Sequence, residues 1–500
     1  MSTIFKRFAA VLLVLTMVLP LAACKKNNET NEAQKVRDTM AVSVGEHTLS
    51  AVMLNYFYMD AVTDWYAKYG TSMGLDISKP LNQQILNEST GKTWADTFME
   101  IALDNIKSTY ALYDLAMAND FQLTPVQQRD LDLVIEDLDA LIEYYTKLYS
   151  SMGQTYPYTS SADYLEAIYG LGSNAENYKE YTRVCTIASA YYDSYYESRN
   201  YTNQQLREYE KDKFAQYSSY SFTTYYVSIA DYASAEEAKA AAQQLADGNY
   251  ADKAAFDAAI LALPINADAK DPAVSESYSA VLYKQITTDY IQWLAEEGRM
   301  PGDMGMIPRE VTADGKTTVK GYYVVRFDGV DNNTFFMKNV RHVLIAFQGG
   351  ILNTNTGETT YPENEKSKAQ FEAEKLLMDY RAGSMTELRF ADLADKNTDE
   401  KNPPAGGLYA DLHPGVLPPV VEAWTFDPSR IPGDTTLVES DKGWHLLYFV
   451  GNSEITYRDY MLTEDLRIAD VDAWYNALLE SAKIELLDTT YVDMALVLGK

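Results

Sequence analysis

Val340-Arg-His-Val-Leu-Ile345 and Gly443-Trp-His-Leu-Leu-Tyr-Phe-Val450 bracket the stretch that decides the fold. Each is a short run of β-branched, aromatic and other apolar residues, and such runs predict β-strands. Each run carries one histidine, His342 or His445, although the whole chain has only 4 histidines. Between the runs lie a helical segment, a Gly-Gly turn and an apolar, proline-containing patch: Phe390–Lys396, Gly406-Gly407 and Val416–Val421. The pattern predicts a small sheet with a polar site on two of its strands.

These features resemble those of the parvulin (rotamase) family of peptidyl-prolyl isomerases. That family has an Arg-His-Ile-Leu strand, a Phe-x-x-Leu-Ala helix, a Gly-Gly turn, a proline-ring pocket and a closing Gly-x-His-Ile-Ile strand. The resemblance implies an α+β domain over residues 336–455, with a small antiparallel sheet flanked by helices. By position in the family pattern, the catalytic residues fall on His342, His445 and Glu400, and the substrate-binding residues fall on Leu417, Val421 and Tyr409.

Prolyl isomerisation needs neither a cofactor nor a metal. Rotation about a peptide bond faces a barrier of about 18–20 kcal/mol, and X-Pro is the bond at which both isomers are populated. Catalysis requires a surface that holds the proline ring, removes water from the amide and favours the twisted transition state. Histidines on neighbouring strands can also bond to each other and only hold the sheet together. Both interpretations of His342 and His445 remain open.

An internal repeat precedes this segment. Trp293-x5-Arg-Met-Pro-Gly-Asp303 matches Trp424-x5-Arg-Ile-Pro-Gly-Asp434 at the same spacing. Thr224-Tyr-Tyr226 parallels Val340-Arg-His342, and Gly321-Tyr-Tyr323 parallels Gly443-Trp-His445. The repeat predicts a degenerate parvulin-like domain over residues 216–335. Tyr226 and Tyr323 would replace the two histidines, so this copy would serve as a scaffold or binding domain.

The N-terminal half has a helical pattern. Residues 41–50 predict two short strands around a glycine turn, and residues 41–215 as a whole resemble the helical module of SurA/PrsA-type chaperones. The helical segment 456–500 has too little apolar sequence for a domain of its own, so we expect it to dock on that module. Cys185 lies in an apolar helical context and predicts a buried thiol. His47 and His413 fall in turns and are expected at the surface.

The first residues have the pattern of an export signal. Lys6 and Arg7 precede an apolar run that is too short for an ordinary membrane span. Leu21-Ala-Ala-Cys24 resembles a bacterial lipobox, which implies removal of residues 1–23, lipidation of Cys24 and a polar tether over residues 24–40. An ordinary signal peptide with a chance cysteine is the alternative. The lipobox interpretation predicts a lipid anchor on the extracytoplasmic face of the cell membrane.

The composition limits the possible functions. A net charge of −30 over 500 residues argues against binding of nucleic acid. No metal-ligand spacing, P-loop or nucleophile elbow is present in the sequence. Three hypotheses remain: a foldase that isomerises X-Pro bonds in exported polypeptides, a holdase that binds unfolded or partly folded exported chains, and a solute-binding lipoprotein. The last requires two α/β lobes, which this pattern does not predict.

Overall fold

The computed structural model describes residues 29–266, 269–270, 272–286, 288–354 and 356–498. The expected signal segment and Cys24 lie outside these residues. The chain divides into two compact units, Met1–Asn200 with Leu466–Lys500, and Tyr201–Asp465. Among the helices in the described ranges, none combines the length and apolar character needed to cross a bilayer.

The first unit is a helical module built on a small three-stranded sheet. Strands β1 (Met40–Val44) and β2 (His47–Ser50) form the predicted hairpin, and β15 (Ile484–Leu486) pairs with β1. Ser50 then caps the next helix by accepting the backbone N–H of Met53. The helices are α1 (Glu29–Asp38), α2 (Ala51–Tyr69), α3 (Trp94–Ala118), α4 (Pro125–Asp132), α5 (Val134–Ser151), α6 (Ser161–Tyr169) and α7 (Ala175–Glu197), with a two-stranded ribbon, β3 (Ile85–Asn87) and β4 (Lys92–Thr93).

Two parts of this unit differ from the sequence-based expectation. Residues 29–38, expected within a polar tether, form helix α1, because Val36 is buried in the core of the unit. The apolar pattern from Pro125 to Tyr149 predicts one helical run, but Leu133 interrupts it and separates α4 from α5.

The C-terminal segment contributes to the same unit. Helix α15 runs from Tyr457 to Ser481, and its residues Val471 and Tyr475 pack with Leu112, Ala188 and Tyr192 of α3 and α7. Apolar residues near the end of the chain, including Val492 and Leu496, join the main core of the module.

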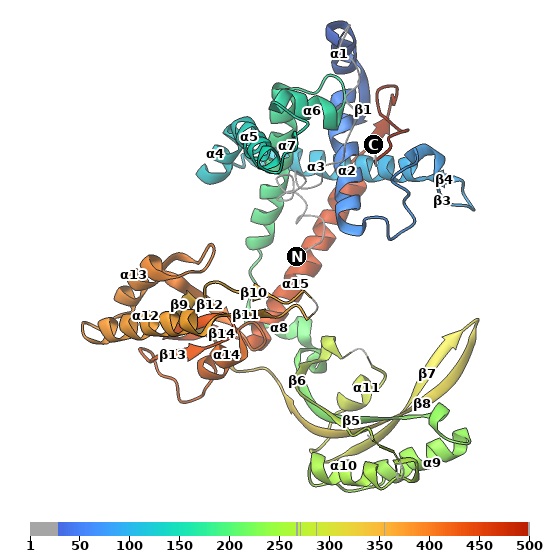
Figure 1. Ribbon diagram of the computed structural model, residues 1–500. Helices are drawn as coiled ribbons and strands as arrows, with labels where there is room; N and C mark the ends of the chain where they lie inside the picture. The colour runs from blue at the N-terminus through green and yellow to red at the C-terminus, as the bar shows by residue number, and fades with distance from the viewer. Residues whose placement is uncertain (1–28, 267–268, 271, 287, 355, 499–500) are drawn as a thin grey trace. The chain divides into compact units, whose positions relative to one another are not determined.

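The second unit contains two four-stranded antiparallel sheets (Figure 1). The first has the order β6-β5-β8-β7, from β5 (Ser219–Ser228), β6 (Glu276–Leu282), β7 (Met304–Ala313) and β8 (Lys316–Asp331). Helices α9 (Ala235–Ala246) and α10 (Lys253–Leu261) pack on one face, and the short α11 (Ile291–Leu294) packs on the other. Helix α8 (Asn203–Glu210), capped by Thr202, precedes this sheet.

The second sheet has the order β12-β9-β14-β13. Its strands are β9 (Phe336–Ala346), β12 (Leu408–Leu412), β13 (Thr435–Glu439) and β14 (Gly443–Thr456). Helices α12 (Glu363–Arg381) and α13 (Glu387–Asn397) pack on the face that carries Val343, Ile345 and Leu446. The remaining elements are the hairpin β10 (Ile351–Leu352) and β11 (Thr359–Thr360), and the short helix α14 (Pro419–Thr425).

The two tryptophan motifs occupy like positions in the two sheets. Trp293 lies on α11 and Trp424 on α14, and each ring stacks with the arginine six residues later, Arg299 or Arg430. In each motif a glycine N–H donates to a phenylalanine carbonyl on the strand beside the edge strand. Gly302 donates to Phe327 of β8 at 2.7 Å, and Gly433 donates to Phe449 of β14 at 2.9 Å. The motif therefore performs the same structural task twice, fixing the entry of an edge strand beside its neighbour.

Strand register corrects one equivalence that the sequence suggests. Phe327 pairs with Phe222 and Phe449 pairs with Val340, so Phe222 corresponds to Val340. Two residues further on, Thr224 is the counterpart of His342, whereas the sequence pattern aligns Tyr226 with it. A shift of two residues leaves every side chain on the same face of a strand, so the apolar pattern does not detect it.

A buried arginine joins the segments between the two sheets. Arg458, at the start of α15, is 1% exposed and is ion-paired with Glu210. Its guanidinium also donates to three backbone carbonyls, those of Phe214, Tyr217 and Asn332. These bonds satisfy a buried charge that would otherwise be costly.

Candidate functional site

The two histidines of the second sheet meet because their strands are neighbours in a fixed register. His342 on β9 pairs with Leu447, and His445 on β14 pairs with Leu344. Residues paired across two strands, and every second residue along them, share a face. Both rings therefore project from the face opposite α12 and α13, and their planes lie 17° apart with centroids 5.0 Å apart.

A connected set of hydrogen bonds joins the predicted catalytic residues. His342 Nε2 lies 2.8 Å from His445 Nδ1, and His342 Nδ1 lies 3.2 Å from Glu400 Oε1. The hydroxyl of Tyr409 donates to the same carboxylate oxygen at 3.1 Å. We call His342, His445, Glu400 and Tyr409 the polar network. Glu400 Oε2 is buried without a hydrogen-bond partner, so one carboxylate oxygen carries both bonds and the other carries none.

Ser440 extends the network, and the sequence did not single it out. It follows β13, and its Oγ lies 2.7 Å from His445 Nε2. One consistent assignment has both rings neutral. The Ser440 hydroxyl then donates to His445 Nε2, His445 Nδ1–H donates to His342 Nε2, and His342 Nδ1–H donates to the ionised Glu400. A serine five residues before the closing histidine is the signal that could have identified it.

The surroundings of each group determine which members of the polar network are charged and which are neutral. Burial and the neighbouring His342 lower the pKa of His445 to about 4, so this ring is neutral at pH 7. Burial opposes ionisation of Glu400, but hydrogen bonds from His342 and Tyr409 outweigh it and hold the pKa of the carboxyl below its usual value. Burial, together with the Glu400 charge, raises the pKa of Tyr409 to about 12. The site thus presents a carboxylate, a phenol that stays protonated and a neutral imidazole.

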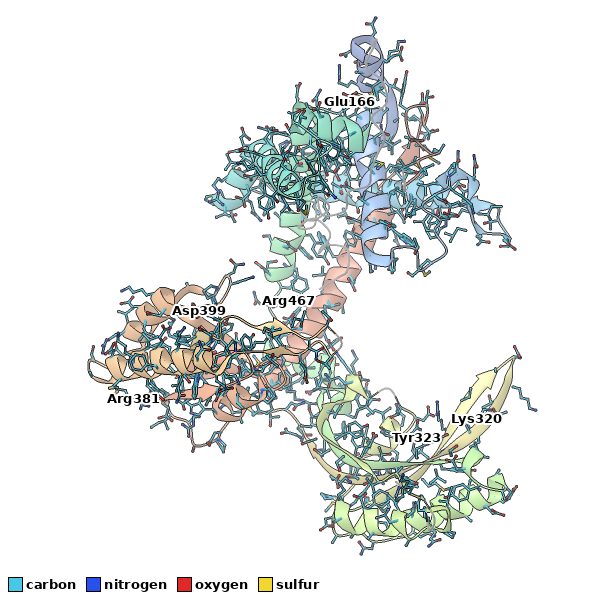
Figure 2. All side chains as sticks on the ribbon, in the orientation of Figure 1. Glu166, Lys320, Tyr323, Arg381, Asp399 and Arg467 are labelled. Carbon is cyan, nitrogen blue, oxygen red and sulfur yellow. The ribbon has the colours of Figure 1, made fainter. Side chains whose placement is uncertain are left out.

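Backbone geometry places Glu400 beside β9. Thr398 ends α13, and the N–H of Asp399, which Figure 2 labels, donates to the carbonyl of Leu344 at 2.8 Å. The Gly-Gly turn then lets the chain return close to the same strand. A Cβ on Gly407 would lie 2.3 Å from the carbonyl oxygen of His342, and the residue has φ +62. Only glycine fits this approach without displacing β9.

An apolar cluster lies on the same face as the histidines. It consists of Val340, Leu412 and Phe449, with the partly buried Tyr409, Leu417, Trp424 and Phe426 packed against them. We call it the Phe449 cluster. The expected substrate-binding residues Tyr409 and Leu417 belong to it. The third, Val421, lies on α14 and is 2% exposed, so its side chain is buried below the surface.

The other residues considered from sequence do not join this site. His413 was expected in solvent, but its ring stacks on Tyr457 at 4.5 Å between centroids, because the loop after β12 meets the start of α15. His47 is partly exposed and its Nε2 lies 2.6 Å from Asp114 Oδ1. The expected buried thiol is confirmed: Cys185 is 4% exposed, and burial raises its pKa.

Comparison with known families agrees with this geometry. Residues 342–451 match the rotamase family model, described as a PPIC-type PPIase domain. This part of the chain is therefore a parvulin domain, and it contains the whole polar network. A comparison with curated proteins found no match to the chain. Across the residues described here, no group of three or more histidine, cysteine, aspartate or glutamate side chains is placed to hold a metal ion.

Proposed function

We propose that the protein is a peptidyl-prolyl cis-trans isomerase that acts on unfolded or partly folded polypeptides through residues 336–455. The observation that carries the proposal is the position of the polar network beside the Phe449 cluster on one face of the second sheet. A proline ring would pack on the apolar cluster, and the imide bond would lie over His342, Glu400 and Tyr409. The amide would leave water there, which favours the less polar twisted state.

The network supports rotation without covalent chemistry. The Tyr409 hydroxyl and the histidine N–H groups are donors, and the Glu400 carboxylate is a fixed negative charge. Donors and charges that are already oriented stabilise a changing amide dipole without reorganising. His342, His445 and Glu400 are the catalytic residues in this proposal, and Tyr409 and Leu417 shape the proline-binding surface, whereas Val421 is buried.

The experiment is an X-Pro isomerisation assay on a panel of short peptides. Wild-type protein should accelerate cis-to-trans exchange, and His342→Ala and His445→Ala should each reduce kcat/KM by about 10²-fold, the usual value of one oriented polar group. Tyr323→Phe is the matched control, because Tyr323 on β8 holds the place of His445 in the first sheet. Absence of acceleration by the wild type across the panel would refute the isomerase proposal.

We further propose that residues 216–335 form a second, non-catalytic parvulin-like domain. The matching strand orders and the matching contacts of the two tryptophan motifs support this. The positions of the histidine pair are held by Thr224 and Tyr323 in this copy. Exchange of these two residues for histidine would test whether the scaffold alone confers activity.

A holdase function is the second candidate. Large apolar side chains are exposed on and beside α12 and α13, and exposed apolar surface favours binding of unfolded chains: Phe371, Met378, Met385 and Leu388 are each at least 59% exposed. Suppression of client aggregation should then survive the histidine substitutions.

By resemblance to SurA/PrsA-type lipoproteins, we propose that the protein works at the extracytoplasmic face of the cell membrane, anchored at Cys24. Loss of lipid labelling in Cys24→Ser would test the anchor.

A further inference from the structure

A lysine lies on the catalytic face of the second sheet, beyond the apolar cluster. The paired residues along this part of the sheet are Leu344 with His445, His342 with Leu447, Val340 with Phe449 and, after a register shift in β14 between Phe449 and Gly451, Lys338 with Asn452. The Nζ atom of Lys338 lies 5.9 Å from the centroid of the Phe449 ring. The apolar cluster is therefore flanked by the polar network at one end and by an ammonium group at the other.

Lys338 is held in place by neutral partners. Its ammonium donates to Asn452 Oδ1 at 2.6 Å, and Leu412 pairs with it on the other side. The nearby carboxylate of Asp411 is engaged by the hydroxyl of Ser453. Among the residues that the structure describes, no carboxylate forms an ion pair with Lys338. Burial lowers the pKa of this lysine.

Within the described part of the chain, Lys338 is a cation without an ion-pair partner that lies against the apolar cluster of the proposed binding surface. The protein has 72 aspartate and glutamate residues and 42 lysine and arginine residues, so carboxylate partners are abundant. A charge that is partly removed from water and left unpaired costs free energy, and such groups concentrate at functional sites. A carboxylate supplied by the bound polypeptide would remove this cost.

We propose that Lys338 is a specificity-determining residue that selects an aspartate or glutamate following the proline of the client. The inference rests on the proposed isomerase function. With the imide bond over the polar network and the ring on the Phe449 cluster, the chain leaves the ring through its own carbonyl, away from the histidines. Lys338 is two residues along β9 from Val340, about 7 Å. One or two residues of extended peptide cover that distance, which places the acid at the first or second position after proline.

The experiment compares Ala-Ala-Pro-Glu and Ala-Ala-Pro-Gln peptides, both blocked at each end, as substrates of the full chain. The ratio of their kcat/KM values isolates the acid side chain, and the long-range repulsion from the acidic protein changes equally in Lys338→Met and in a control variant that also loses one lysine. Lys338→Met should lower this ratio about fivefold, the upper range for a partly exposed ion pair. It should leave the Gln peptide unchanged, because methionine keeps the apolar stem over Phe449.

Lys375→Met is the matched control. This lysine is exposed on α12, which covers the opposite face of the sheet, so its removal changes net charge equally and should leave the ratio at the wild-type value. Raising the salt concentration should shrink the difference between wild type and Lys338→Met. An equal loss on both peptides would show that Lys338 is merely structural, and an unchanged ratio would refute the subsite.

Failure of the isomerase proposal would be recognised separately. If wild-type protein accelerates exchange of neither peptide, the same ratio is measured as Kd with fluorescently labelled peptides. A fivefold weaker preference for the Glu peptide in Lys338→Met would then support the subsite in a protein that binds without catalysing. Equal affinities of wild type and variant for both peptides would overturn it.

Discussion

Replacing Glu400 with glutamine is the most direct test of the polar network. The change keeps the size of the side chain and removes its charge. In the structure, Oε1 accepts hydrogen bonds from His342 Nδ1 at 3.2 Å and from the Tyr409 hydroxyl at 3.1 Å. Hydrogen bonds to a charged acceptor contribute about 1.5–3 kcal/mol each, and about 1.4 kcal/mol corresponds to a tenfold change in rate.

The expected result is a fall in kcat/KM of about 10–100-fold on a neutral X-Pro peptide. Loss of one charge-assisted bond accounts for this range, because the amide oxygen of glutamine can still accept the other. Only the part of each bond that strengthens in the transition state affects the rate, so the upper end is a limit. The rate would be measured by peptide exchange NMR at pH 7, with circular dichroism to verify folding.

Asp399→Asn provides the control at the adjacent position. Asp399 Oδ2 accepts the N–H of Ala346 at 2.9 Å, a bond that asparagine can preserve. This variant loses the same unit of charge from the same loop and should retain wild-type kcat/KM. A folded Glu400→Gln protein with a rate within about twofold of wild type would refute the reasoning and leave the network a structural contact between strands.

Three further outcomes follow from the same contacts. Tyr409→Phe should lower kcat/KM by at most about 10- to 100-fold, since it removes one hydrogen bond of about 1.5–3 kcal/mol to the charged Glu400 and keeps the ring. Because the pKa of His445 is about 4 in the folded state and 6.5 ordinarily, the folded state binds fewer protons between these values. The contribution of neutral His445 to the free energy of unfolding is fully present above pH 6.5 and should fall by on the order of 3 kcal/mol as the pH drops to 4. Hydrogen exchange of β9 and β14 would measure this loss, and His445→Gln should abolish it. Asp60, on α2, behaves oppositely: burial raises its pKa to about 7 despite hydrogen bonds from Tyr181 and Tyr169, so the folded state binds more protons between pH 3.8 and 7 and stability falls as pH rises. Asp60→Asn should therefore slow hydrogen exchange of α2 and α7 at pH 8, slow it less at pH 5, and have little effect below about pH 3.8. Equal exchange of wild type and variant at pH 8 would contradict this prediction.

Local pattern determined most of the secondary structure. The β-branched runs around His342 and His445 form the predicted strands, and Ser50 and Thr202 cap the helices that follow them in sequence. These features depend on side chains within a few residues of each other, so they can be read directly from the chain. The family pattern also identified Glu400 as the carboxylate beside His342, because this residue lies at a fixed distance in sequence from the end of α13 and from the Gly-Gly turn.

Contacts between distant segments decided the rest. The buried side of α1 and the stacking of His413 on Tyr457 depend on residues far away in sequence. Ser440 joins the network only because β13 and β14 form a hairpin in one register. The alignment of Thr224 with His342 was hidden for a related reason: strand periodicity is unchanged by a shift of two residues, and only the pairing across the sheet distinguishes the two alignments. Sequence thus specified which residues face the same way, and the tertiary structure specified which of them meet.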